Sequence, residues 1–107
     1  MIEGTHGTTG FGMEVRSTAE VAALVRERGG RLFVWPDRQR CCQGATYLAT
    51  ASDPPRAGAF RRVGGSDGSE IWFDPAGLEP PDVLQLDVRG WRTKRVEAYW
   101  NGCVFVV

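Results

Sequence analysis

The feature that most constrains the fold is that helix signals end early, after which glycine and proline divide the chain into short apolar runs. Residues 17–20, Ser-Thr-Ala-Glu, form a capping box, in which Ser17 and a glutamate three residues later satisfy free backbone amides. Val21, Leu24 and Val25 follow at helical spacing. Gly29-Gly30 is typical of a left-handed helix end, since glycine adopts that backbone without steric cost. We therefore expect one short helix in this segment.

After this helix, β-prone segments alternate with turn residues. The segment 31–35 is apolar and bounded by glycine and proline, which predicts a strand. Further strands are expected at 45–52, 60–63, 70–73, 83–88 and 94–100. Asn101-Gly102 then leads into a final β-prone run, 103–107, and Asn-Gly between two such runs is typical of a type I′ hairpin.

This order of elements predicts the fold class α+β. One N-terminal helix would pack on a mostly antiparallel β-sheet, or on two small sheets, because no alternation of strands and helices indicates parallel pairing. At 107 residues the chain is expected to hold one domain. Residues 1–12 are polar and rich in glycine, so we expect a disordered tail there and a single compact α+β domain over 13–107.

The charges are balanced over the whole chain but segregated along it. Thirteen basic residues oppose thirteen acidic ones, which gives no general attraction to nucleic acid or to an anionic membrane, so neither is an expected partner. The segment 67–87 has six acids and no base, and 89–107 has four bases against Glu97 alone. Two interpretations stay open: neighbouring strands pair opposite charges, or a basic face receives an acidic partner.

Several features bear on location and catalysis. No apolar run is long enough to span a membrane, and residues 1–12 lack the apolar stretch of a secretory signal, which favours a cytoplasmic location.

His6 is the only histidine and lies in the expected tail, whereas a catalytic triad needs a histidine held beside its nucleophile. The glycine-rich segment 64–68 precedes a strand and not a helix, so it does not predict a phosphate site. We therefore expect that the protein is not an enzyme.

The three cysteines are the candidate site. Cys41 and Cys42 are adjacent in a predicted turn, where both can face one ion, as they could not in a strand. Arg38 and Arg40 flank them and favour the thiolate form. If the last strand returns beside this turn, Cys103 completes a group of three sulfurs.

Three sulfurs do not complete a four-thiolate zinc site or an iron–sulfur cluster, so water, a carboxylate, His6 or a second subunit would supply the fourth ligand. The alternative is that the cysteines pack as small hydrophobic residues. An odd number of cysteines favours a reducing cytosol over a disulfide framework. Most of the large aromatic residues fall in predicted strands, where core packing is their usual role; the set is Trp35, Trp72, Trp91, Trp100, Phe33, Phe60 and Phe73. No alternation of aromatic and basic residues on one face supports base stacking.

The order of these features resembles the HesB-like A-type iron–sulfur carriers. A capped helix and a strand precede Cys42-Gln43-Gly44-Ala45-Thr46-Tyr47, and a glycine-rich turn, the segment 71–74 and the strand at 83–88 follow. The resemblance implies a compact β-rich fold, dimerisation, and iron or a cluster held by cysteines of two chains. Cys42 would match the first ligand and Cys103 one of the last two. Asn101 stands where that family has its other C-terminal cysteine, and Val104 replaces a glycine.

Two functions follow as predictions. The first is an iron–sulfur cluster or metal-handling carrier that binds iron or a cluster through Cys42 and Cys103, assisted by Cys41. The second is a non-catalytic binding or interaction module of the same fold, with structural cysteines and no cofactor. Both predict a protein partner or a homodimer.

Overall fold

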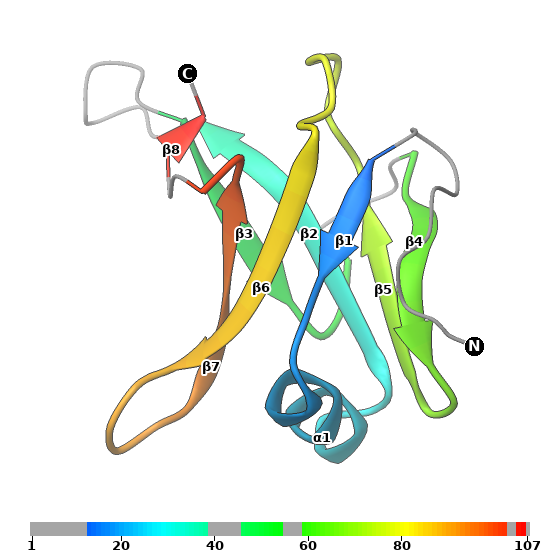
Figure 1. Cartoon of the computed structure of the whole chain (residues 1–107), viewed down its shortest axis with the longest axis vertical. Helices are drawn as coiled ribbons and strands as arrows, with labels where there is room; N and C mark the ends of the chain where they lie inside the picture. Colours follow the sequence, from blue (N-terminus) through cyan, green and yellow to red (C-terminus); the bar gives the residue numbers. More distant parts are fainter. Residues whose placement is uncertain (1–12, 39–45, 55–58, 103–104, 107) are drawn as a thin grey trace.

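A computed structural model describes residues 13–38, 46–54, 59–102 and 105–106 of the chain (Figure 1). Within these ranges it has eight strands and one helix. The strands are β1 (Glu14–Arg16), β2 (Arg31–Arg38), β3 (Thr46–Ala51), β4 (Arg61–Ser66), β5 (Ser69–Phe73), β6 (Val83–Arg89), β7 (Arg95–Trp100) and β8 (Phe105–Val106), and the helix is α1 (Ala19–Glu27). The expected tail, residues 1–12, lies outside the described residues.

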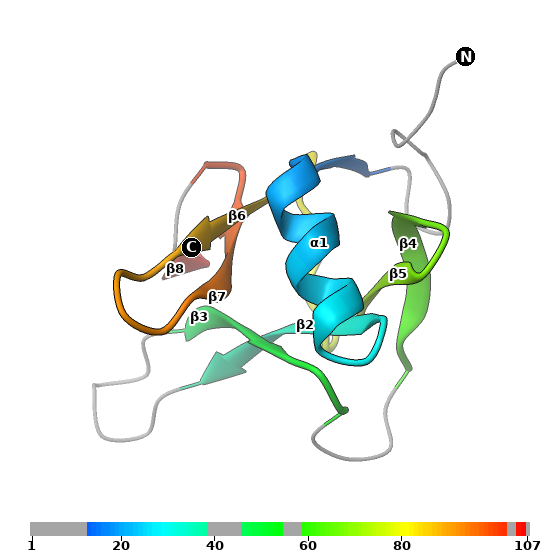
Figure 2. The same ribbon diagram turned by 90° about the horizontal axis from the view of Figure 1, so that it is seen from below.

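The strands form two sheets that face each other. The three-stranded sheet has the order β1-β6-β7, and the five-stranded sheet has the order β4-β5-β2-β3-β8. Figure 2, seen from below, shows α1 lying between the two sheets at one end of the molecule. The helix therefore closes an open end between two sheets, which is why it is short and buries only one face.

The predicted α+β class is wrong. The fold is a small, sheet-rich one in which strands predominate and the single described helix has nine residues. Both sheets are mixed: most strand pairs are antiparallel, but β1 pairs with β6, and β2 with β5, in parallel. These partners are far apart in the sequence, and their pairing depends on burial between sheets, whereas local patterns indicate only the pairing of neighbouring strands.

The end of the chain departs from the expected hairpin. Asn101 has φ 50° and Gly102 has φ 87°, the two positive values that a type I′ turn requires. In the described residues, however, β8 pairs with β3 and not with β7, with Thr46 opposite Val106. The amide of Asn101 donates to the carbonyl of Val83 at 2.9 Å, so Asn101 extends the β6–β7 ladder before the chain crosses to the other sheet.

The core lies between the sheets and under α1. Phe73, Leu84 and Val34 have no solvent exposure, and Val21, Leu24 and Val25 of α1 are buried against them, as the helical spacing predicted. The helix cap differs by one residue from the prediction. Thr18 and not Ser17 is the N-cap, and its Oγ1 accepts a hydrogen bond from the amide of Val21 at 3.2 Å.

A second aromatic cluster lies on the opposite face of the five-stranded sheet. The ring of Phe33 packs edge-on against Phe60, with centroids 5.2 Å apart, and stacks with Trp72 at 6.3 Å. Trp35 contacts Phe60 at 6.2 Å, and Trp100 lies in the core 6.0 Å from Phe73. Trp100 therefore packs in the core, as expected for most of the large aromatic residues, whereas Trp35 and Trp72 are half-buried in this second cluster.

Candidate functional site

The cysteines predicted as ligands lie outside the described residues. This holds for Cys41, Cys42 and Cys103, and also for His6. Their segments lead into β3 and β8, which pair with each other, so the last strand does return beside the strand that follows the predicted cysteine turn. Within the described ranges, no group of three or more histidine, cysteine, aspartate or glutamate residues is placed to hold a metal ion. The thiolate site stays a prediction.

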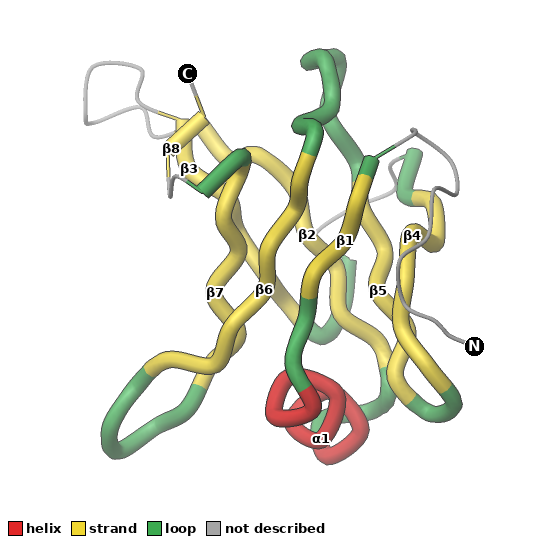
Figure 3. The backbone as a smooth tube through the Cα atoms, in the orientation of Figure 1, coloured by secondary structure: helices red, strands yellow, loops and turns green. Residues whose placement is uncertain are grey.

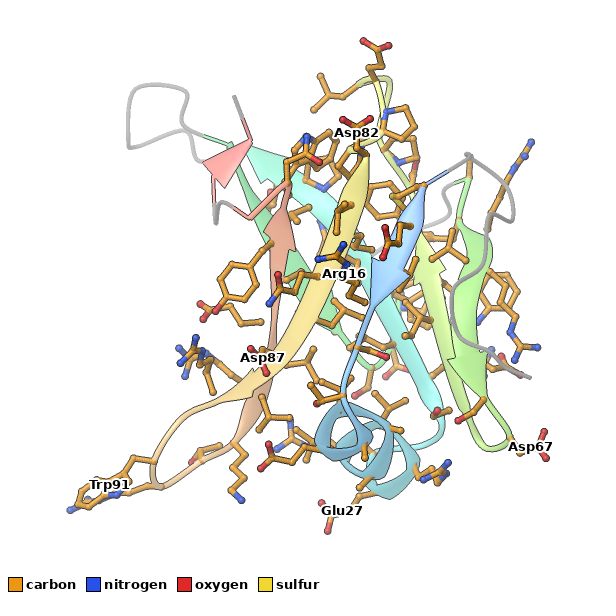
Figure 4. The ribbon with its side chains drawn as sticks, viewed as in Figure 1. Arg16, Glu27, Asp67, Asp82, Asp87 and Trp91 are labelled. Carbon is orange, nitrogen blue, oxygen red and sulfur yellow. The ribbon has the colours of Figure 1, made fainter. Side chains whose placement is uncertain are left out.

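The most exposed large apolar side chain that the structure describes is Trp91, which is 88% exposed. It lies in the loop between β6 and β7. Figure 4 shows it at the tip of this hairpin, pointing away from the rest of the molecule. Trp91 therefore lacks the core packing that was expected for most of the large aromatic residues. A large aromatic side chain exposed to this extent gains little from folding, so its role must be sought outside the core.

The hairpin that carries Trp91 is also the most basic part of the described chain. Its sequence from 89 to 95 is Arg-Gly-Trp-Arg-Thr-Lys-Arg, with no acidic residue. The guanidinium carbon of Arg92 lies 5.8 Å from the centroid of the Trp91 ring. Such a cation–π contact stabilises an exposed pair by about 0.5–1 kcal/mol, so it favours an arrangement in which ring and cation are presented together.

At the base of the hairpin, Arg89 interacts with neighbouring polar side chains, whereas the basic residues at the tip form no ion pair among the described residues. The side chain of Arg89 donates a hydrogen bond from Nε to the hydroxyl of Tyr99 at 3.1 Å, and that hydroxyl donates to Glu97 at 2.9 Å. The bond to Tyr99, together with the charge of Asp87, raises the pKa of Arg89.

The free cations lie beyond this base. Among the described residues, Arg92, Lys94 and Arg95 are exposed and form no ion pair. Within this hairpin, the positive charge available to a partner is therefore concentrated at the tip.

The β6–β7 register contributes to this concentration. Asp87 lies opposite Glu97, and Arg89 lies opposite Arg95, so like charges face each other across the hairpin. Directly opposed like charges destabilise a strand pair, and the expectation that neighbouring strands pair opposite charges is not met at this hairpin. Carboxylates gather at its base and guanidinium groups toward its tip.

The loop at the tip is sterically constrained. Gly90 has φ 111°, and a Cβ built there would lie 2.1 Å from the carbonyl oxygen of Thr93. No other residue type can adopt this backbone without moving the loop. Trp91 therefore projects from a defined turn, which limits the conformational entropy that binding would cost.

The basic tip continues into the body of the molecule. Figure 3 shows the β6–β7 loop and α1 at the same end. Arg28, which follows α1, donates a hydrogen bond from Nη2 to the carbonyl of Lys94. Arg28, Arg31 and Arg95 line a small cavity of about 100 Å³, and no aspartate or glutamate is among its lining residues. We define the basic surface as the set of six residues Arg28, Arg31, Trp91, Arg92, Lys94 and Arg95.

Comparison with known proteins finds no relative: no family model, no curated protein and no solved structure matches the chain. The resemblance to the HesB-like carriers therefore stays a prediction from motif order. In the part of the chain that the structure describes, no helix has the length and apolar content needed to cross a membrane. The four basic residues of 89–95 contributed to the prediction of a basic face, but that prediction did not use the tryptophan that lies among them.

Proposed function

We propose that this protein is a non-catalytic binding module whose basic surface receives an acidic segment of another protein. The observation that carries the proposal is Trp91, which is 88% exposed on a constrained hairpin tip beside cations that form no ion pair in the described residues. Tryptophan and arginine are the residues most enriched among those that dominate binding energies at protein interfaces.

The two residue types would have different roles in binding. Burial of the Trp91 ring would supply most of the affinity, because truncation of such an aromatic anchor costs about 2 kcal/mol or more. The exposed cations Arg92, Lys94 and Arg95 would contribute about 0.2–1 kcal/mol each in ion pairs with carboxylates. Their larger effect would be on the association rate and on the choice of an acidic partner.

An acidic protein segment fits this surface better than a nucleic acid does. A nucleic acid presents a long row of phosphates, which extends beyond the three cations of the hairpin tip. Binding to single strands also normally uses several aromatic residues along a basic groove, whereas the tip offers Trp91 alone. The chain as a whole has no net charge. A short segment with a few carboxylates around an apolar residue matches one ring and three cations.

The test is a binding titration with a fluorescein-labelled synthetic peptide that carries several glutamates around one leucine. Fluorescence anisotropy should show binding that weakens with salt. Trp91→Ala should weaken it about 30-fold, the equivalent of about 2 kcal/mol. The double variant R92Q/K94Q should weaken it about tenfold.

Two controls separate the alternatives. Arg62→Gln removes one positive charge from β4, outside the basic surface, and should leave the affinity unchanged. The same peptide with glutamines in place of glutamates should bind poorly. If a labelled thymidine oligonucleotide binds more tightly than the acidic peptide, or if Trp91→Ala binds as the wild type does, the proposal is wrong.

The thiolate carrier is a second candidate, supported by one observation. Because β3 pairs with β8, the strands that follow Cys42 and Cys103 are neighbours in one sheet. Such a carrier would hold iron or a cluster through Cys42 and Cys103, with Cys41 assisting. Anaerobic reconstitution with iron and sulfide should then give a coloured protein whose colour is lost in Cys42→Ser, and a colourless product would contradict it. The odd number of cysteines favours a reducing cytosol for either candidate.

A further inference from the structure

A second site, independent of the basic surface, is a cavity of about 270 Å³ between α1 and the β4–β5 hairpin. It shares no lining residue with the basic surface. We propose that this cavity binds a small carboxylic acid with a short apolar chain. Its volume lies just below the range of typical ligand pockets, which limits the ligand to a small molecule.

The cavity exists because both of its walls carry small side chains. Ala19 and Ala22 line it from α1, and Gly65 and Ser66 line it from β4. Gly65 has φ 111°, and a Cβ there would lie 2.1 Å from the carbonyl oxygen of Ser69, so only glycine fits. Glycine within a strand often marks a place where a ligand approaches the backbone closely.

The path of β4 beside the cavity is irregular. The β4–β5 register shifts between Arg62 and Gly64, which is a bulge. Bulges bend the strand and are over-represented next to functional sites. Here the bulge directly precedes the glycine and serine that form the cavity wall.

The floor of the cavity is apolar. Val21 and Val25 of α1 and Ile71 of β5 line it, and all three are buried in the core. An apolar chain of a ligand would contact these side chains. Each buried methylene group of such a chain would raise the affinity about fourfold.

One cation is fixed at the wall of this cavity. The guanidinium of Arg26 donates from Nε to the carbonyl of Asp67 at 3.0 Å and from Nη2 to the hydroxyl of Ser66 at 3.2 Å. Arg26 has no ion pair with any described residue. A guanidinium has five donor hydrogens, so donors remain after these two bonds.

Two serine hydroxyls complete the polar side. Ser69 is 2% exposed, the buried polar residue of the described core, and its Oγ lies 3.1 Å from that of Ser66. Ser66 thus joins Arg26 to a buried hydroxyl at the same wall. A pinned guanidinium beside hydroxyl donors is suited to a carboxylate, which can accept two parallel N–H bonds. A phosphate dianion would require more than this single cation.

The experiment is a calorimetric and NMR titration of the full chain with hexanoate and, in parallel, with hexanol. Hexanoate should bind more tightly than hexanol, and the amides of Gly65, Ser69 and Ile71 should shift. Arg26→Gln should reduce the affinity for hexanoate at least tenfold and leave the weak affinity for hexanol unchanged. Arg92→Gln, at the tip of the β6–β7 hairpin and outside the cavity, should change neither affinity.

A second variant keeps the proposal testable if Arg26→Gln loosens the hairpin. Ala22→Leu fills the cavity and retains Arg26, so it should abolish hexanoate binding and leave thermal stability close to that of the wild type. Binding of the acidic peptide should be unchanged in this variant, which separates this inference from the proposed function. The inference is overturned if hexanoate binds no better than hexanol, or if Arg26→Gln or Ala22→Leu binds hexanoate as the wild type does.

Discussion

Replacement of Trp91 by alanine should leave the free energy of unfolding nearly unchanged, whereas the same replacement of Trp100 should lower it strongly. The two residues form a matched pair, because both belong to the β6–β7 hairpin and have the same side chain. Trp91 is 88% exposed, and Trp100 is 9% exposed with its ring 6.0 Å from that of Phe73. Trp91 is thus the proposed binding residue, and Trp100 is part of the core.

The magnitudes follow from the exposed fractions. Folding removes from water only about an eighth of the Trp91 surface, roughly 30 Å² of a side chain of about 250 Å². At about 25 cal/mol per Å² this is less than 1 kcal/mol. Loss of the contact with Arg92 adds about 0.5 kcal/mol. Replacement of a buried tryptophan such as Trp100 by alanine costs about 3–5 kcal/mol through lost burial and the cavity that remains.

Urea denaturation followed by far-ultraviolet circular dichroism measures both changes, provided that the slope m is the same in the two variants. Thermal unfolding gives a second measurement, in which 1 kcal/mol corresponds to about 4 °C for a domain of this size. If Trp91→Ala destabilised the protein by about 3 kcal/mol, the Trp91 ring would be packed and the reasoning refuted. If Trp100→Ala lowered the free energy of unfolding by less than about 1 kcal/mol, Trp100 would not be part of the core, which would also contradict the prediction.

Three further predictions use the same assays. Gly90→Ala should destabilise the hairpin by about 1–3 kcal/mol and weaken peptide binding, because the new Cβ would lie 2.1 Å from the Thr93 carbonyl oxygen. As a control, Gly77→Ala is also at a positive φ but has open space around it, so it should lower the free energy of unfolding less, as measured by urea denaturation. Thr18→Ala should cost about 1 kcal/mol through loss of the helix cap, and Ser17→Ala less than about 0.5 kcal/mol; the reverse order would restore the capping box predicted from the sequence. Iodide should quench tryptophan fluorescence less in the double variant R92Q/K94Q than in the wild type, with quenching by neutral acrylamide unchanged in both; equal iodide quenching would show that no positive potential surrounds Trp91.

Local elements of this fold could be predicted from the sequence, and non-local pairing could not. The spacing of Val21, Leu24 and Val25 predicted the buried face of α1, because the helical period depends on neighbouring residues alone. The strand Glu14–Arg16 was missed because three residues are too few to show a period. The parallel pairing of β2 with β5 was missed because it depends on how the two sheets pack.

The basic surface and the cavity differ in how far the sequence indicates them. The composition of residues 89–95 is visible in the sequence, but a tryptophan in a β-rich domain normally packs in the core, so its exposure needed the structure. The cavity needed the structure entirely. It arises where Ala22 of α1 faces Gly65 and Ser66 of β4, and no local pattern brings these residues together.

The most direct test of the central claim is a heteronuclear NMR titration of the full chain with the acidic peptide. We expect the NMR resonances of the Trp91 indole N–H and of the amides of residues 89–95 to shift together and saturably, with smaller shifts at Arg28 and Arg31. The other tryptophan indoles should not move. Shifts centred on another face of the molecule, or an unchanged Trp91 indole at saturating peptide, would contradict the account.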